Sequence, residues 1–463
     1  MKNMTPEKMA AAAGGSLLGP EDAFQKEITD VVTDSRKIQS GCLFAAIRGE
    51  RADGHSFIGQ TIREGAGCVL AEYLPEDTEP EVPVIMVKDT RKALRDLAAY
   101  YLDQMAVPTI GIIGSAGKTS TKEMVAAVLS QRYRVLKTEG NFNNELGVPL
   151  TVFRIREEHQ IAVIEMGINH FGEMDRLASI VRPDTVIMTN IGTAHLEFLK
   201  DRDGILKAKS EVFDHLRPES RVILNGDDDK LITLREIRGK RPLFYAVDNE
   251  DADIRAVNIE SVGIEMVRCE IITPGFSFEA VIPGSGMHIV HNTLAGAAAG
   301  YRYGLTPGEI AEGIAAYKSL PGRFQITRTG MLTIIDDSYN ANPSSMKASL
   351  KVLQNANGRK TAILGDMGEL GEKAPELHRE VGLQAGAMPI DVLYCTGELG
   401  RYIAEGAERS AEETGSEKVI RWFPDREELT AAVLASLQEG DTVLVKASRF
   451  MAFEEIVKAL KSL

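Results

Sequence analysis

Residues 109–131 contain the pattern that most restricts how this chain can fold: an apolar strand, a glycine-rich turn and a helix. The turn reads Gly111-Ile-Ile-Gly114-Ser-Ala-Gly117-Lys118-Thr119-Ser120. In such a turn, backbone N–H groups converge on phosphate oxygens at the helix N-terminus, the lysine reaches the outer phosphates, and the threonine can ligate Mg²⁺. The pattern predicts a phosphate site formed by Gly114, Ser115, Ala116, Gly117, Lys118, Thr119 and Ser120.

The phosphate turn departs from the longer form of its motif at one position. The pattern G-x-x-x-x-G-K-[ST] requires glycine where Ile112 stands, while the shorter form from Gly114 to Thr119 is intact. The alternative is a tight strand–helix turn with an incidental lysine, but the strand before and the helix after favour phosphate binding. A metal at this site needs an acid that ends a neighbouring strand, and Glu165 in Ile161-Ala-Val-Ile-Glu165 suits that role.

Short apolar strands alternate with helical stretches over most of the chain. The predicted strands are 109–113, 162–165, 185–190 and 222–225, and then 332–336, 361–364, 392–395 and 442–446. This alternation is typical of βαβ units and a largely parallel sheet. Residues 243–282 instead predict antiparallel strands at a sheet edge.

The length of 463 residues is typical of about three domains. We expect an α/β protein with a smaller α/β domain at 1–105, a central P-loop domain with a mostly parallel sheet at 106–320, and a Rossmann-like α/β domain at 321–463. Ligands of parallel sheets bind beyond the carboxyl ends of the strands. In the last domain this places Asp337, Asp366, Gly397 and Lys446 at the expected binding edge.

Charge and composition exclude several classes of protein. Lys and Arg number 53 against 67 Asp and Glu, a net charge of −14. Because nucleic-acid binding needs a basic field, we expect no nucleic-acid partner, although one local pocket can still bind a nucleotide. The four scattered cysteines favour a reduced, cytoplasmic protein. The longest uncharged run, 280–301, contains Pro, His and Gly residues, so we expect no membrane insertion.

Two residues beyond the strand at 185–190 are candidates for chemistry. His195 lies just past that strand, where a lone histidine is more often a packing or capping residue. Lys209 shares the apolar stripe of the next predicted helix with Ile205, Val212 and Leu216. Burial lowers the pKa of an ammonium group, and a neutral amine can add CO₂ to form a carbamate that suits Mg²⁺. The residue pattern supports equally a lysine that reaches solvent at the surface.

The ordered set of motifs resembles the Mur ligase family, which builds the peptide stem of bacterial cell-wall precursors. The resemblance covers essentially the whole chain. Beside the phosphate turn and Glu165-Met-Gly, it rests on Gly140-Asn141-Phe-Asn143-Asn144, Asn190-Ile-Gly-Thr-Ala-His195, Lys209, Gly286-Met-His288 with Asn292, Pro321-Gly-Arg323, and Asp337-Ser-Tyr339 with Asn342-Pro343. Each motif alone is modest, whereas their shared order is specific.

The resemblance implies roles for the residues of the phosphate site. Lys118 and Thr119 would hold the phosphates of ATP and Mg²⁺. Glu165 and His195 would ligate Mg²⁺ together with Thr119, with Lys209 acting as a carbamate. Further contacts with ATP would come from Asn292, Arg323 and Asp337.

The first domain contains two segments that resemble a uridine-nucleotide-binding domain. They are Thr33-Asp34-Ser35-Arg36 and Arg48-Gly with Asp53-Gly54-His55. Two family members share this domain: those that add the third residue of the stem and those that add the terminal dipeptide. The resemblance implies that Ser35 and Arg36 contact substrate, while the alternative is a Gly/Asp turn that joins two strands.

The last domain separates these two members. An Asp-Asn-Pro-Arg motif, typical of the diamino-acid-adding member, is absent from the sequence. Instead Leu364-Gly-Asp366-Met-Gly-Glu369-Leu-Gly371 and Val445-Lys446-Ala-Ser448-Arg449 resemble the dipeptide-adding member, with Ala447 where glycine is common. The resemblance further implies substrate contacts at Asn141, Asn143, Asn144, His170, Tyr339, Asn342, Lys446, Ser448 and Arg449.

The activity implied is ATP-dependent amide formation between UDP-N-acetylmuramoyl-tripeptide and D-alanyl-D-alanine, by a monomer with Mg²⁺ and a carbamate on Lys209. Competing hypotheses are the diamino-acid-adding ligase and a folylpolyglutamate-type ligase. From a different class, a P-loop ATPase or kinase switch explains Lys118 and Thr119 but leaves Lys209 and the last domain without a role. A nucleotide-binding regulator without chemistry is disfavoured because the inferred metal and phosphate residues are all present.

Overall fold

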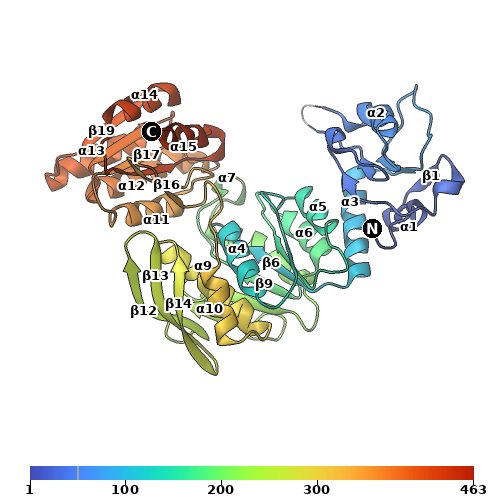
Figure 1. The fold of residues 1–463 in the computed structure, drawn as a ribbon, viewed down its shortest axis with the longest axis horizontal. Coiled ribbons are helices and arrows are strands. Elements are labelled where there is room, and N and C mark those ends of the chain that lie inside the picture. Colours follow the sequence, from blue (N-terminus) through green and yellow to red (C-terminus); the bar gives the residue numbers. More distant parts are fainter. Residues whose placement is uncertain (50–51) are drawn as a thin grey trace.

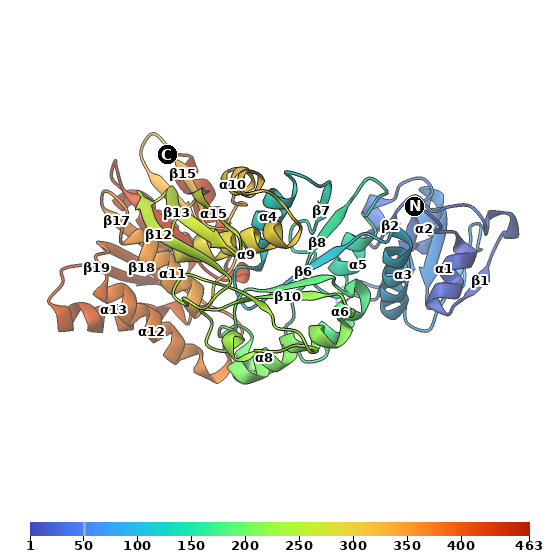
Figure 2. The same ribbon diagram turned by 90° about the horizontal axis from the view of Figure 1, so that it is seen from below.

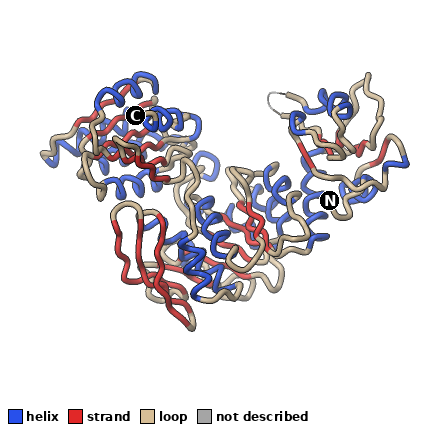
Figure 3. Tube along the Cα trace, in the orientation of Figure 1, coloured by secondary structure: helices blue, strands red, loops and turns tan. Residues whose placement is uncertain are grey.

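The computed structural model describes residues 1–49 and 52–463, and these form three lobes (Figure 1). Each lobe contains its own β-sheet with helices around it, as Figure 3 shows by secondary structure. In the view from below, the lobes lie in a row, with the N-terminal and C-terminal lobes at opposite ends (Figure 2). Positions 50 and 51, within the segment that begins at Arg48, lie outside the described residues.

The N-terminal lobe is built on a sheet with the strand order β1-β5-β4-β3-β2. Strand β1 is antiparallel to β5 and the other neighbours are parallel. Strands β3 and β4 are buried along their whole length, which explains why they are continuous apolar runs in the sequence. The elements are α1 (Pro6–Ala13), β1 (Ser16–Leu18), β2 (Val31–Val32), β3 (Leu43–Ala45), α2 (Ile58–Arg63), β4 (Cys68–Ala71), β5 (Val84–Met86) and α3 (Thr90–Met105).

The middle lobe contains a sheet with the order β14-β13-β12-β11-β10-β9-β6-β8-β7. Its parallel strands are β6 (Thr109–Ile113), β7 (Val135–Lys137), β8 (Ile161–Glu165), β9 (Thr185–Met188), β10 (Arg221–Asn225) and β11 (Leu243–Ala246). Strand β12 (Ile254–Val262) is parallel to β11, and β13 (Met266–Thr273) and β14 (Phe276–Pro283) complete an antiparallel edge.

The antiparallel edge predicted for residues 243–282 is therefore correct for β13 and β14 and wrong for β11. Strand β11 pairs in parallel with both of its neighbours. Its sequence, Leu-Phe-Tyr-Ala, is an almost wholly buried run without alternation. Continuous apolar runs are typical of parallel strands that are covered on both faces.

Helices α4 (Lys118–Leu129) and α9 (Met287–Arg302) pack closely behind the phosphate turn. A Cβ added at Gly296 would lie 2.8 Å from Cγ of Met124, and one at Gly300 would lie 2.9 Å from Cγ1 of Val128. Small residues on α9 thus allow the close approach that fixes α4 on the sheet. The uncharged run 280–301 forms the end of β14 and most of α9, and among the described residues no helix is long and apolar enough to cross a membrane.

The remaining helices of the middle lobe cover the sheet and lead into the last lobe. They are α5 (Gly147–Val152), α6 (Glu173–Val181), α7 (Leu196–Leu199), α8 (Arg202–Ser210) and α10 (Pro307–Ala315). The helix predicted to hold Lys209 with Val212 and Leu216 is shorter in the structure. It ends at Ser210 and continues as a 3₁₀ helix, Glu211–His215, and Pro218 follows. Pro218 disfavours helical backbone angles at Arg217, so the helical segment cannot continue beyond this point.

The C-terminal lobe contains a sheet with the order β15-β16-β20-β17-β18-β19, parallel except for the edge strand β15. Its strands are β15 (Gln325–Arg328), β16 (Thr333–Asp336), β17 (Lys360–Leu364), β18 (Val392–Thr396), β19 (Val419–Phe423) and β20 (Thr442–Lys446). Its helices are α11 (Pro343–Leu353), α12 (Ala374–Ala387), α13 (Gly400–Thr414), α14 (Arg426–Ser436) and α15 (Glu454–Lys461). The predicted α/β class with mostly parallel sheets is confirmed.

Candidate active site

A cavity of about 1530 Å³ lies where the middle and C-terminal lobes meet, and Arg91 of α3 also lines it. Its walls include most of the residues that the sequence singled out. From the middle lobe these are Ser115, Ala116, Gly117, Lys118, Thr119, Ser120, Asn141, Asn143, Asn144, Glu165, His195 and Asn292. From the hinge and the C-terminal lobe they are Arg323, Asp337, Tyr339, Asn342, Lys446, Ser448 and Arg449.

The phosphate turn joins β6 to α4, as predicted, and neighbouring loops fix its shape. Its residue Gly114 has a φ of +147°, and a Cβ there would lie 2.0 Å from Oγ1 of Thr189. The Ala116 N–H donates to Oδ1 of Asn190 at 2.9 Å, and the Thr189 hydroxyl donates to the Ala116 carbonyl at 2.6 Å. Only glycine is compatible with such contact and such a backbone angle, so β9 and the loop after it position the turn.

Glu165 ends β8 beside the first turn of α4 and fits the role of a metal ligand. The carboxylate is 1% exposed, and its Oε1 accepts from Thr119 Oγ1 at 3.3 Å and from Asn143 Nδ2 at 2.7 Å. Its Oε2 is buried and has no hydrogen-bond partner in the described part of the chain. A buried carboxylate oxygen without a partner is costly, and a hard cation such as Mg²⁺ binds such oxygens.

Burial lowers the pKa of two lysines near the phosphate turn, Lys118 and Lys209. Burial lowers the pKa of Lys118, whose Nζ donates to the Gly114 carbonyl at 3.0 Å. The pKa of Lys209 lies well below its ordinary value because of burial and, second, because of repulsion by Lys118. Lys209 is 1% exposed, whereas Lys207 on the same helix is exposed, as the helical periodicity indicates. Burial thus disfavours the ammonium form of Lys209, and Lys118 lies close enough for its charge to add to this effect.

His195 contacts the C-terminal lobe. It stands at the N-terminus of α7 with a φ of +60°, and its Nδ1 pairs with the Glu369 carboxylate. The hydrogen bond from this imidazole is the first cause that lowers the pKa of Glu369.

Among residues 1–49 and 52–463, no group of three or more His, Cys, Asp or Glu side chains could hold a metal ion. Donors of other types must therefore take part if the site binds Mg²⁺. The hydroxyl of Thr119, which lines the cavity beside Glu165, is a donor of such a type.

Some asparagines of the segment 140–144 make hydrogen bonds within the protein that stabilise the local fold. Asn143 contacts Glu165, whereas Oδ1 of Asn144 accepts the N–H of Gly147 at 2.9 Å and starts α5. Asn292 on α9 accepts the Thr121 hydroxyl at 2.9 Å and faces Gly117. Asn292 therefore links α9 to the first turn of α4.

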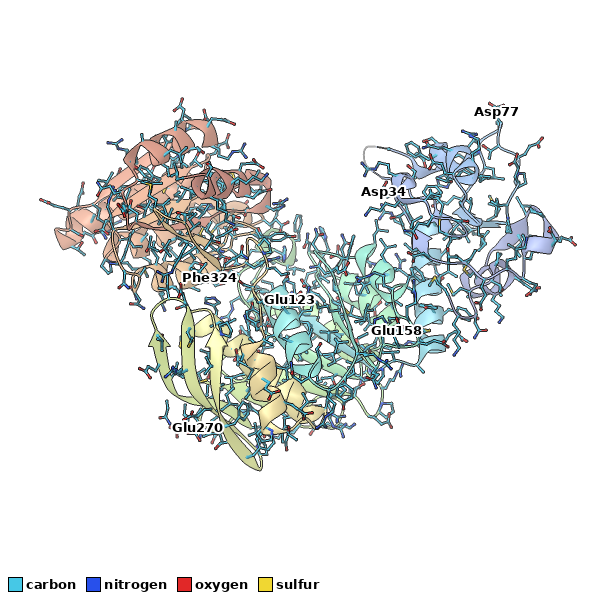
Figure 4. The ribbon with its side chains drawn as sticks, in the orientation of Figure 1. Asp34, Asp77, Glu123, Glu158, Glu270 and Phe324 are labelled. Atoms are coloured by element: carbon cyan, nitrogen blue, oxygen red, sulfur yellow. The ribbon has the colours of Figure 1, made fainter. Side chains whose placement is uncertain are left out.

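The C-terminal wall of the cavity carries a compact charged group. The Arg323 guanidinium lies 3.8 Å from the centre of the Tyr339 ring, and that of Arg449 lies 5.5 Å from the same ring. The Lys446 ammonium pairs with Asp337, whose Oδ1 accepts the Phe324 N–H at 3.1 Å. Figure 4 labels Phe324 at this junction, between the C-terminal lobe and the strands of the middle lobe.

Several predicted residues have structural partners in this conformation. Asn342 caps α11 through Ser345, and Ser448 Oγ accepts the Gly368 N–H at 2.9 Å. Asp366 accepts the Gly400 N–H at 2.7 Å and starts α13, and neither it nor Gly397 lines the cavity. Parallel strands thus bring Asp337 and Lys446 to the binding edge, as predicted, while Asp366 anchors a helix instead.

Five predicted site residues do not line the cavity: Ser35, Arg36, Gly114, His170 and Lys209. Ser35 and Arg36 belong to the N-terminal lobe, where the hydrogen bonds of Arg36 lower the pKa of Asp34 to about 2. Figure 4 shows Asp34 on the side of that lobe that is turned toward the C-terminal lobe. His170 pairs with Glu173 at 3.0 Å and packs on Phe198 outside the cavity wall.

The residues that line the cavity without a role predicted from the sequence include Tyr317, Glu369 and Phe450. Burial raises the pKa of Tyr317 to about 12, and Phe450 is 67% exposed. Glu369 lies inside a motif already singled out and Phe450 directly follows another, so their segments could have pointed to them. Nothing in the pattern around Tyr317 marks it.

Family models match the chain in three blocks. Residues 112–300 match the Mur ligase middle domain, residues 322–449 the Mur ligase glutamate ligase domain, and residues 27–102 the catalytic domain of the Mur ligase family. The blocks correspond to the three sheets.

Full-length relatives carry one name. The UDP-N-acetylmuramoyl-tripeptide–D-alanyl-D-alanine ligase of Bacillus subtilis is 37% identical, with 99% of each chain covered. That of Escherichia coli is also 37% identical, with 100% of this chain and 99% of the relative covered. Among solved structures, MurF from Acinetobacter baumannii aligns with a TM-score of 0.90 at 34% identity over 99% of both chains. The MurF ligase from Thermotoga maritima in complex with ADP aligns with a TM-score of 0.82 at 28% identity, over 94% of this chain and 97% of that one.

Proposed function

The chain belongs to the Mur ligase family, and we propose that it joins D-alanyl-D-alanine to the C-terminal carboxylate of UDP-N-acetylmuramoyl-tripeptide with ATP. The products are the pentapeptide precursor, ADP and phosphate. The observation that carries this function is the cavity, in which the phosphate turn of an ATP-dependent ligase faces the Arg449 segment of the C-terminal lobe. Full-length similarity to ligases of this name supports the choice of substrates.

The reaction follows from the weak electrophilicity of a carboxylate. Transfer of the γ-phosphoryl group to the tripeptide carboxylate gives an acyl phosphate, which the dipeptide amine attacks before phosphate leaves. Lys118 and Arg323, which line the same cavity, would neutralise charge on the transferring group. Among the described residues, the side chain of Lys118 is hydrogen-bonded only to a backbone carbonyl, and phosphate oxygens would be stronger partners.

We assign Mg²⁺ to the region between Thr119, Glu165 and His195, with Asn143 fixing the Glu165 carboxylate. The partnerless Oε2 of Glu165 supports this assignment. When bound, Mg²⁺ would offset the negative charge of the phosphate oxygens. Asn292 and Asp337 are proposed as further contacts of ATP.

We further propose a carbamate on Lys209. The amine nitrogen bonds to the carbon of CO₂ and releases one proton, which leaves an anionic N-carboxylate. The lowered pKa of Lys209 supports this step because only the neutral amine reacts.

Replacement of Lys209 tests the carbamate. Lys209→Ala should abolish nearly all ligation while ATP binding is largely kept, and exposed Lys207→Ala should behave as the wild-type chain. The measurements are ATP binding by calorimetry, ligation by phosphate release, and ¹³C NMR after exposure to ¹³CO₂. Full activity of Lys209→Ala would remove the residue from the mechanism.

The remaining site residues are proposed as substrate contacts. Ser35 and Arg36 would bind the uridine nucleotide, and the dipeptide and tripeptide would contact Asn141, Asn144, His170, Tyr339, Asn342, Lys446, Ser448 and Arg449. We keep 1–105, 106–320 and 321–463 as the proposed domains, and a cytoplasmic monomer as the proposed state. Four free, buried cysteines support a reducing compartment.

One assay separates the hypotheses. Phosphate release from ATP is followed with UDP-N-acetylmuramoyl-tripeptide plus either D-alanyl-D-alanine or single amino acids. The mass of the nucleotide product is measured by mass spectrometry. Release that requires the dipeptide is the expected result. Release with a diamino acid and the dipeptide-stem nucleotide would indicate the diamino-acid-adding member. ATP turnover that does not depend on any peptide or amino acid would indicate an ATPase switch.

A further inference from the structure

The contact between His195 and Glu369 joins two lobes at the edge of the proposed metal site. Its residues are 174 positions apart in the sequence. His195 comes from the middle lobe, beside α7, and Glu369 from the loop after β17 of the C-terminal lobe. Both line the cavity that also contains Thr119 and Glu165.

Both residues have strained backbones. The φ of His195 is +60° and that of Glu369 is +61°, in the left-handed region that non-glycine residues seldom adopt. Such angles persist where the surrounding structure holds them, and they concentrate at functional sites.

Contacts on both sides hold the pair in place. The Glu197 N–H donates to the Glu369 carbonyl at 3.4 Å, so the backbones of the two lobes also meet. Within the C-terminal lobe, the Met367 N–H donates to Nε2 of the buried His378 at 2.8 Å, and Gly368 is bound to Ser448. The loop therefore presents the Glu369 carboxylate from a rigid base.

The chemistry of the pair fits a metal-binding histidine. Its Nδ1–H donates to the Glu369 carboxylate, which leaves the lone pair of Nε2 for a cation. A carboxylate behind a ligating histidine fixes the ring orientation and raises the basicity of the ligand, and its loss typically costs about tenfold to a hundredfold in metal affinity.

We propose that Glu369 is a positioning residue for metal binding, which aligns His195 only when the C-terminal lobe is docked. This inference rests on the proposed function for the identity of the metal site. It couples lobe closure to metal affinity: the lobe that would receive the incoming peptide also orients the histidine ligand of the cation that ATP needs.

The test uses the full chain with Mn²⁺ in place of Mg²⁺ and a non-hydrolysable ATP analogue. Pulsed electron paramagnetic resonance detects coupling between Mn²⁺ and a histidine nitrogen, and a titration gives the Mn²⁺ affinity. In the wild-type chain we expect a nitrogen coupling that His195→Ala removes. Glu369→Ala should lower the affinity about tenfold to a hundredfold and weaken the coupling. Glu369→Gln keeps an acceptor oxygen, so its Mn²⁺ affinity and its nitrogen coupling should lie between those of the wild-type chain and those of Glu369→Ala.

The matched control is Glu372→Ala, an exposed acid three positions further along the same loop. It should leave affinity and coupling unchanged. Wild-type affinity and coupling in Glu369→Ala would overturn the proposal, and so would a wild-type chain without histidine coupling. These readings need no peptide substrate, so they are independent of the phosphate-release assay on which the proposed function depends.

Discussion

Single positions decide whether the phosphate turn can form. Gly114 meets Thr189 so closely that no side chain fits, and its backbone angle also excludes other residues. This restriction does not apply to glycines on open helical surfaces, where an added methyl group would contact no other atom. The structural requirement for glycine therefore differs between the turn and the rest of the lobe.

Substitution of Gly114 gives a sharp prediction at this scale. Gly114→Ala should reduce the affinity for an ATP analogue more than about tenfold, because the turn must shift away from β9. Calorimetric titration measures the effect. The control is Gly308→Ala on α10, where nothing lies within 4 Å of the new Cβ and the helix should gain about 0.5–1 kcal/mol. Unchanged nucleotide affinity in Gly114→Ala would contradict the assigned role of the turn.

At the scale of elements, helix α12 anchors the loop that presents Glu369. Buried His378 on α12 accepts the Met367 N–H, and its Nδ1 donates to the Ala374 carbonyl at 2.6 Å. This arrangement requires a neutral ring. Burial lowers the pKa of His378, since the protein interior disfavours the imidazolium.

The lowered pKa predicts how the loop responds to acid. The unfolded state binds the proton first, with a pKa near 6.5, so the stabilisation by neutral His378 is fully present above about pH 6.5. It is lost as the pH falls toward the lower folded pKa. Hydrogen exchange of residues 364–371, corrected for intrinsic rates, should therefore accelerate as the pH falls below about 6.5.

The control for this prediction is His378→Gln, whose amide can both accept and donate. Its exchange at pH 7.5 should stay close to wild type, and the acceleration in acid should disappear. If His378→Gln showed the same acceleration, another group would have to be its source.

At the scale of the whole molecule, the site depends on how the three lobes are arranged relative to one another. The cavity takes its walls from the middle and C-terminal lobes, while the segment around Ser35 lies in the N-terminal lobe, apart from the C-terminal lobe in Figure 1. An acyl phosphate is lost to water unless the site closes around it. A substrate held by the proposed contacts at Ser35 and at Arg449 would therefore draw the lobes together.

Closure can be measured by small-angle X-ray scattering. The radius of gyration should decrease when an ATP analogue and the tripeptide nucleotide are both bound, relative to the free chain. Each ligand alone serves as the control and should give a smaller change. Identical profiles in all four states would count against closure.

The sequence by itself determined the elements and the local chemistry. Periodicity predicted the parallel strands and placed Lys209 on the apolar stripe of its helix, and the spacing of Gly114, Gly117 and Lys118 predicted the phosphate turn between β6 and α4. These features depend on residues within about one turn or one strand, where steric preference and hydrophobic burial act locally.

The tertiary structure alone decided the contacts between distant segments. It paired His195 with Glu369, used Ser448 and Asn342 to anchor loops, and extended the parallel sheet to β11. No local pattern encodes these outcomes, because each depends on which surfaces the packed lobes bring within hydrogen-bonding distance. The sequence specified the groups that do chemistry, and the packing of the lobes decided which of them meet.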